Sequence, residues 1–211
     1  MKTFGRVLTA MITSFNEDGS VNIENTVAIA EHLLNHGSDG LVVCGTTGEN
    51  PTISRESKTA LFKAIAKACG DKGTIIANVG SNDTKGSVDF VKEVSTIPGI
   101  DGLLVVVPYY NKPNQLGQYL HFKSIAEATT LPIMVYNVPG RVGTGIFPAT
   151  LARLHKEYPH ICAIKEASGN LMIASEIKRL MPGEDFMVYS GDDGLTLPIL
   201  SVGGTGVISV V

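Results

Sequence analysis

Short, continuous apolar runs alternate along the chain with longer segments in which apolar residues recur every three or four positions. Continuous runs of Val, Ile and Leu are typical of strands that are buried on both faces of a parallel sheet. We therefore predict strands over residues 7–11, 41–44, 74–79, 102–107, 132–136, 161–166, 187–190 and 206–210.

The segments between these runs have the spacing of amphipathic helices. Ser54 is a suitable N-cap for one helix, and Gly37 is a suitable C-terminal stop for another. Pro198 interrupts the last and shortest of them. We predict helices over residues 23–36, 54–69, 84–97, 116–128, 147–158 and 170–181, with a short one within 193–202.

This strict alternation predicts parallel strands joined by right-handed crossovers, and eight strands predict an α/β fold, the (β/α)₈ TIM barrel. A doubly wound open sheet would need a Gly-x-Gly-x-x-Gly motif near residues 9–13, which is absent. We expect residues 1–211 to form one catalytic barrel domain. Because the chain stops as the eighth strand ends, we expect the last barrel helix to be missing and apolar surface to lie uncovered there.

Composition narrows the possible partners. The chain has 211 residues, a net charge of -3 and no basic run, which argues against nucleic acid and anionic membranes. Three widely spaced cysteines predict neither a disulfide framework nor a zinc site, and they fit a cytoplasmic location. The apolar run at 103–107 is far too short to cross a bilayer, and the N-terminus lacks the apolar core of a signal peptide.

Lys165 stands at the end of the apolar run that begins at residue 161. Burial favours the neutral amine, which is a nucleophile able to form a Schiff base with a carbonyl compound. The alternative is that Lys165 reaches solvent or pairs with Glu166. That pairing is geometrically poor, since neighbouring side chains in a strand point to opposite faces.

Other strand ends carry hydroxyls and cations, and in such barrels the chemistry lies at the strand ends. Thr46 and Thr47 are flanked by glycines and could bind a carboxylate, although a simple turn explains them equally well. Tyr136 ends the fifth strand and could shuttle protons, and Arg141 could clamp a carboxylate. A core tyrosine and a surface charge are the alternatives.

Two further loops are less specific. The loop over residues 108–113 carries Tyr109 and Tyr110, which could serve packing alone. Asp192 and Asp193 follow the seventh strand and are more typical of a helix cap than of a metal site. No histidine falls at a strand end, so we expect no metal. Together the strand ends suit imine chemistry on a small oxo acid.

Five motifs occur in order, at residues 45–49, 108–113, 136–141, 164–166 and 190–193. They resemble the dihydrodipicolinate synthase (4-hydroxy-tetrahydrodipicolinate synthase) family of the N-acetylneuraminate lyase superfamily, over residues 5–211. The resemblance implies a lyase without a cofactor that condenses pyruvate with L-aspartate 4-semialdehyde. The product would be 4-hydroxy-tetrahydrodipicolinate, in lysine and diaminopimelate biosynthesis.

The resemblance also implies the proton relay of the site. Lys165 would form the Schiff base with pyruvate, and Tyr136 would pass protons at the imine. Thr47 would link Tyr136 to Tyr110, which a neighbouring subunit would supply. A homodimer or homotetramer is therefore implied.

The same resemblance implies how the substrates are held. Thr46 and Thr47 would hold the pyruvate carboxylate with backbone N–H groups. Arg141 would receive the carboxylate of the semialdehyde. Gly191 and Ile208 would line the pocket through their backbone.

The chain departs from the family in two respects. Members continue with a further barrel helix and a small helical C-terminal domain, which this sequence lacks. Lysine-sensitive members bind L-lysine between subunits, and Asn82 and Tyr109 match that pocket. However, Gly86 replaces its glutamate, and Arg55 and Lys58 replace histidines. We expect weak or no inhibition by L-lysine.

Three alternative functions remain from the sequence. The chain could be another pyruvate-dependent aldolase that cleaves a sialic acid or a 2-keto-3-deoxy sugar acid, although Arg141 suits a short semialdehyde better. Residues 203–206 could bind phosphate in a phosphate-binding barrel. The shortened barrel could also be inactive.

Overall fold

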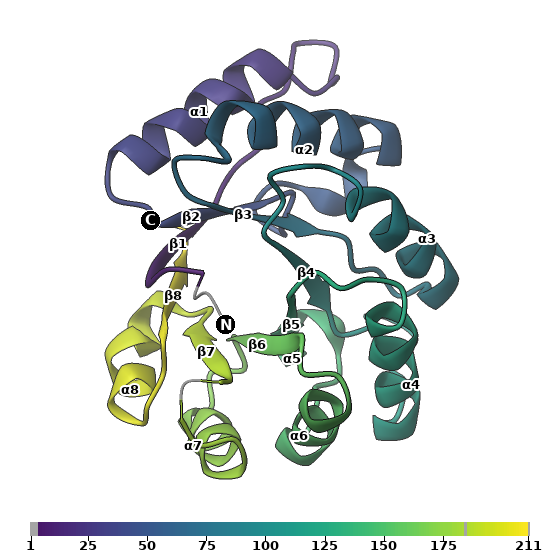
Figure 1. The fold of residues 1–211 in the computed structure, drawn as a ribbon, viewed down its shortest axis with the longest axis vertical. Helices are drawn as coiled ribbons and strands as arrows, with labels where there is room; N and C mark the ends of the chain where they lie inside the picture. The colour runs from purple at the N-terminus through teal and green to yellow at the C-terminus, as the bar shows by residue number, and fades with distance from the viewer. Residues whose placement is uncertain (1–3, 184, 211) are drawn as a thin grey trace.

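Eight parallel strands close into a barrel in sequence order in the computed structural model, which describes residues 4–183 and 185–210 (Figure 1). Pairing of β1 with β8 completes the ring, with Leu8 opposite Ile208. This confirms the predicted TIM barrel, with boundaries shifted by at most one residue. The strands are β1 (Val7–Ala10), β2 (Gly40–Val43), β3 (Thr74–Asn78), β4 (Gly102–Val106), β5 (Ile133–Asn137), β6 (Ile161–Glu166), β7 (Met187–Ser190) and β8 (Gly206–Ser209).

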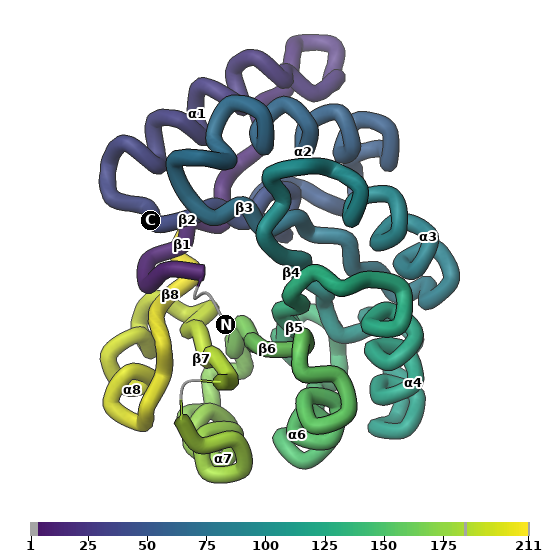
Figure 2. The backbone as a smooth tube through the Cα atoms, viewed as in Figure 1, coloured from purple at the N-terminus to yellow at the C-terminus, as the bar shows by residue number. Residues whose placement is uncertain are grey.

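Helices surround the barrel, as the backbone trace also shows (Figure 2). Ser54 caps α2 as predicted, since its side chain accepts a hydrogen bond from the Ser57 N–H. Pro198 is tolerated in the first turn of α8, where the N–H groups lack partners within the helix. The helices are α1 (Ile23–Asn35), α2 (Arg55–Cys69), α3 (Thr84–Val94), α4 (Gln115–Ala126), α5 (Pro139–Val142), α6 (Pro148–Glu157), α7 (Leu171–Leu180) and α8 (Thr196–Ser201), with 3₁₀ turns at Asn50–Thr52 and Asp193–Leu195.

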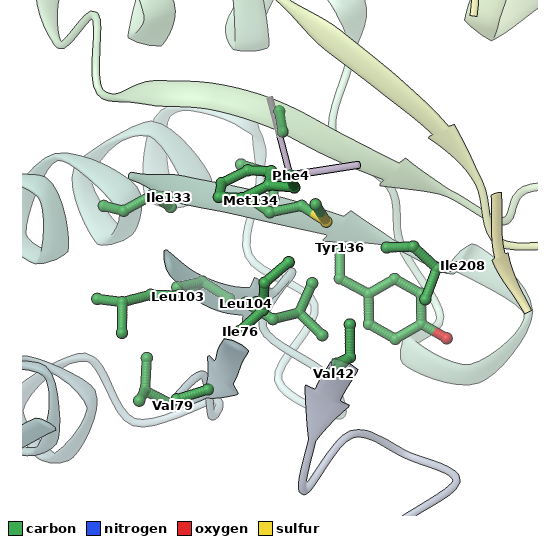
Figure 3. Close-up of a cluster of buried hydrophobic side chains, with 14 of the residues drawn as sticks. Phe4, Val42, Ile76, Val79, Leu103, Leu104, Ile133, Met134, Tyr136 and Ile208 are labelled. Atoms are coloured by element: carbon green, nitrogen blue, oxygen red, sulfur yellow. The ribbon is translucent and has the colours of Figure 1, made fainter. Parts of the chain in front are cut away.

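Two apolar layers hold the fold together. Inside the barrel, Leu104, Tyr136 and Ile208 belong to one buried cluster, and the Tyr136 ring and Ile208 lie side by side at its edge (Figure 3). Between the strands and the helices, large side chains such as Phe62 and Phe122 are fully buried. Burial on both faces explains why the strands read as continuous apolar runs.

The outer side of β1 and β8 is more open. Val7 is 43% exposed, and Val207 of β8 is only partly buried. This fits the expectation of uncovered apolar surface beside the first and last strands. Among the helices that the structure describes, none is long and apolar enough to cross a membrane.

Candidate active site

Lys165 lies in β6, whose six residues are all buried. In the sheet it is registered with Tyr136 of β5 and with Tyr189 of β7. Its Nζ is 4.9 Å from the centroid of the Tyr136 ring. Gly191 closes the other side, because a Cβ at that position would be 2.9 Å from both Cγ and Cε of Lys165. The lysine stem is therefore held between a ring and a backbone.

Burial is the main reason why the pKa of Lys165 falls to about 8. Asp193 opposes this shift by raising the pKa, and the positive charge of Arg141 adds to it. Near pH 8 a large fraction of the amine is thus neutral and nucleophilic.

Glu166 points away from Lys165, and the alternative of an ion pair between these neighbours is wrong. Its Oε2 accepts a hydrogen bond from Asn137 Nδ2 at 2.8 Å, and its Oε1 accepts one from the Ser168 N–H at 2.7 Å. Burial raises the pKa of the Glu166 carboxyl, and these hydrogen bonds lower it. The sequence had not indicated this role of Asn137, although a polar residue at the end of a buried strand is a usable signal.

Tyr136 is 7% exposed at the end of β5. Burial raises the pKa of its phenol, while a hydrogen bond with the Thr46 side chain and the charge of Arg141 lower it. Tyr136 thus contacts Thr46, whereas the resemblance had implied a relay contact with Thr47.

A cavity of about 520 Å³ opens above Lys165 at the carboxyl ends of the strands. It brings together most of the predicted site, including both threonines. Ile208 lies inside the barrel beside Tyr136 (Figure 3), whereas Val210 is the residue following β8 that lines the cavity. The lining residues are Thr46, Thr47, Tyr136, Val138, Arg141, Lys165, Ala167, Gly191, Asp192, Asp193, Gly194 and Val210.

A second cavity of about 250 Å³ adjoins the first, and the two share Thr46, Tyr136, Val138 and Arg141. Its walls are largely apolar. The remaining lining residues are Asn50, Pro51, Asn78, Leu104, Val106, Tyr109 and Val142. Asn78, which ends β3, was not among the site residues predicted from the sequence.

Arg141 is presented to both cavities by α5, a four-residue helix that the sequence analysis did not predict. The helix starts directly after β5 with Pro139 near its first position and ends at Gly143, whose φ is 78°. Among the described residues, Arg141 makes no ion pair. Its guanidinium is available for an incoming carboxylate.

A sequence profile of the dihydrodipicolinate synthetase family matches residues 3–211. The chain belongs to this family. The 4-hydroxy-tetrahydrodipicolinate synthase of Desulforamulus reducens is 52% identical over 98% of this chain and 69% of that protein. The synthase of Moorella thermoacetica is 53% identical over 99% of this chain and 70% of that protein.

Solved structures of the dihydrodipicolinate synthetase family have the same barrel. The dihydrodipicolinate synthase of Bacillus anthracis superposes with a TM-score of 0.95 at 44% identity, over 100% of this chain and 71% of that one. The enzyme of Cyanidioschyzon merolae with lysine bound gives 0.95 at 45% identity, over 98% and 70%. These findings confirm the predicted family, barrel and lyase of lysine and diaminopimelate biosynthesis, and they do not favour the other aldolases or an inactive barrel.

One residue of the predicted site, Tyr110, lies apart from the two cavities. Tyr110 is 88% exposed and lines neither cavity, whereas its neighbour Tyr109 lines the second one. The φ of Tyr110 is 70°, an unusual value for a bulky residue. Within one chain the phenol of Tyr110 is therefore directed to the surface.

Positions 55, 58 and 86 correspond to the lysine pocket of lysine-sensitive family members, and their charges differ in this chain. Arg55 forms an ion pair with Glu93 at 2.7 Å, so its charge is compensated. Lys58 is half-buried, and burial lowers its pKa. A Cβ at Gly86 would be 2.5 Å from Oδ2 of Asp83, so the Asp83 carboxylate lies where a side chain at position 86 would begin.

Proposed function

We propose that this chain condenses pyruvate with L-aspartate 4-semialdehyde through a Schiff base on Lys165, giving 4-hydroxy-tetrahydrodipicolinate. The observation that carries the proposal is a buried lysine with a pKa of about 8, facing a cavity lined by threonine and tyrosine hydroxyls. Residues 1–211 act as a single catalytic barrel domain in this proposal. A cytoplasmic location is part of the same proposal.

The first step forms the imine. The neutral Nζ of Lys165 attacks the ketone carbon of pyruvate, and the ketone oxygen leaves as water after protonation. Thr46 and Thr47 hold the pyruvate carboxylate, and Gly191 leaves room for the lysine stem. Tyr136, whose ring lies 4.9 Å from the amine, carries the protons.

The second step forms the carbon–carbon bond. Loss of a proton from the methyl group of the imine gives an enamine, whose carbon attacks the aldehyde of the semialdehyde. The aldehyde oxygen takes up a proton and becomes a hydroxyl. Arg141 lines both cavities and holds the carboxylate of the semialdehyde with charge-assisted hydrogen bonds.

The third step frees the enzyme. The amino group that came with the semialdehyde attacks the imine carbon, the six-membered ring closes, and the Lys165 amine leaves with a proton. This transimination needs no further reactant.

The proton relay is completed by a second copy of the chain. Tyr136 is hydrogen-bonded to Thr46, and Tyr110 of the partner would extend this chain of hydroxyls. The exposure of Tyr110 supports this arrangement, as does the adjoining cavity next to Thr46. The chain therefore works as a homodimer or homotetramer.

A coupled assay with pyruvate and L-aspartate 4-semialdehyde tests the function. We expect turnover by the wild-type chain, or by a version extended to the length of its relatives, and none by Lys165→Ala. Aldol cleavage of sialic acid or of a 2-keto-3-deoxy sugar acid, without this condensation, would contradict the proposal.

A further inference from the structure

The second cavity contains a buried hydrogen-bond acceptor without a donor. Asn78 is 5% exposed and lines this cavity. Its Nδ2 donates to the carbonyl of Cys44 at 2.8 Å, which fixes the orientation of the amide. In the part of the chain that the structure describes, its Oδ1 has no hydrogen-bond partner. Buried acceptors in folded proteins are almost always paired, so a donor from outside the chain is expected.

The walls of the cavity restrict the chemistry of that donor. Leu104, Val106, Val138 and Val142 make most of the lining apolar, and Leu104 belongs to the buried cluster in Figure 3. An ammonium group would lose its hydration there without gaining a counter-charge at Asn78. A neutral hydroxyl on an apolar body fits both the walls and the acceptor.

A group of this kind projects from the surface next to the cavity. Tyr110 is 88% exposed, and the preceding residue, Tyr109, lines the cavity. The loop that presents Tyr110 is held by hydrogen bonds from Asn111, whose N–H donates to the Tyr109 carbonyl at 2.8 Å and whose Nδ2 donates to the Asn82 carbonyl at 3.2 Å. A projecting ring beside a cavity that accepts it makes the surface self-complementary, as a two-fold dimer requires.

We propose that Asn78 is a positioning residue whose Oδ1 accepts a hydrogen bond from the Tyr110 hydroxyl of a second copy. This inference rests on the proposed function, in which Tyr110 acts between subunits, and it adds the residue that holds the phenol in place. The hydroxyl can donate to Asn78 and still accept a hydrogen bond from Thr46. Asn78 thereby fixes the far end of the hydroxyl chain that starts at Tyr136.

A double-mutant cycle tests the contact in the full-length enzyme. Asn78→Leu, Tyr110→Phe and the double variant are compared for dimer dissociation constant and for kcat. We expect Asn78→Leu to weaken the dimer roughly 5- to 150-fold in the Tyr110 enzyme, because the two symmetric hydrogen bonds of the dimer are lost together. It should have little further effect in the Tyr110→Phe enzyme, where both bonds are already absent. Equal effects of Asn78→Leu in the two backgrounds would overturn the proposal, as would a chain that is monomeric at all concentrations.

A conservative variant separates this role from the contact with Cys44. Asn78→Asp, when protonated, keeps an oxygen acceptor for the phenol and a donor for the Cys44 carbonyl. We expect its dimer affinity and its kcat, each relative to the wild type at the same pH, to be largely regained at low pH and lost as the pH rises, which a purely structural defect would not do. Borohydride trapping of pyruvate on Lys165 is measured in every variant. If trapping fails in the wild type, the proposed function fails; if trapping is normal and the cycle is additive, only the role of Asn78 fails.

Discussion

Arg141 is the cation that the two cavities share, and it makes no ion pair within the described residues. It also contributes to the depressed pKa of Lys165. Its side chain can therefore affect the use of both substrates. It would bind the carboxylate of the semialdehyde directly, and its positive charge influences the Lys165 amine that reacts with pyruvate. The two effects differ in size, because a charge-assisted hydrogen bond is stronger than an interaction at a distance.

We predict that Arg141→Ala weakens the use of L-aspartate 4-semialdehyde far more than it weakens trapping of pyruvate. Loss of a charge-assisted contact costs about 1.5–3 kcal/mol, or roughly one to two orders of magnitude in kcat/KM. Arg179→Ala is the matched control, since this arginine lies on α7 and is paired with Glu176. An equal loss for both substrates would make Arg141 a structural residue.

The sequence indicated which strand ends line the cavity, but not which of two adjacent side chains makes a given contact. Lys165 and Tyr136 were predictable because each polar residue ends a buried strand. The contact of Thr46 with Tyr136 was not, because it depends on a turn in which Cys44 and Glu49 have φ values of 54° and 59°. Non-glycine residues in this region are uncommon, and nothing in the residue types announces them.

The contact between α3 and α4 contains a buried histidine. His121 is 3% exposed, and its Nδ1 is hydrogen-bonded to Oγ1 of Thr84 at 2.8 Å. Burial lowers the pKa of His121 to about 4, and the nearby Asp83 partly opposes this shift. The native state thus holds His121 in its neutral form.

We predict that acidification destabilises this contact. In the unfolded chain the imidazole binds a proton near its ordinary pKa of about 6.5, while the folded chain resists until about pH 4. The free energy of unfolding should therefore fall as the pH drops below 6.5. The total loss is about 3 kcal/mol once the pH is below the folded-state pKa. Urea unfolding of the wild type and of His121→Gln between pH 5 and 7 checks this, with His36→Gln as an exposed control. A wild-type slope that persists in His121→Gln would contradict it.

Helices and strands were well predicted where the segment was long enough to show a regular pattern of apolar residues. The boundaries of β6 and β7 match those predicted, and Ser54 was recognisable as an N-cap. The exception is α5, whose four residues are too few to show a period.

Tyr110 points outward from the barrel, and this exposure has a functional consequence. We predict that Tyr110→Phe slows turnover strongly while the Schiff base still forms. Mixing Tyr110→Phe with Lys165→Ala subunits should restore about a quarter of wild-type activity when dimers form at random. If mixed oligomers form and no activity returns, Tyr110 does not act between subunits.

We also predict that free L-lysine inhibits weakly or not at all. Position 86 carries no glutamate for the ligand, and losing one charge-assisted bond costs about 1.5–3 kcal/mol. Arg55 is neutralised by Glu93, so the expected repulsion comes from Lys58. Lysine titration of the active enzyme measures the effect. Half-inhibition below the millimolar range would show that Asp83 replaces the missing carboxylate.

The closed barrel was predictable because alternation of strands and helices leaves few topologies. The two adjoining cavities and the orphan acceptor of Asn78 were not, since they arise from residues that different strands bring together. Assembly was implied only by resemblance, because the exposure of Tyr110 is visible in three dimensions alone.

Covalent capture of pyruvate shows directly which residue forms the Schiff base. The enzyme is incubated with pyruvate, reduced with borohydride and digested, and the peptide masses are measured. We predict one adduct on Lys165, formed faster as the pH rises through about 8, where the amine becomes neutral. An adduct on another lysine, or none in the folded protein, would contradict it.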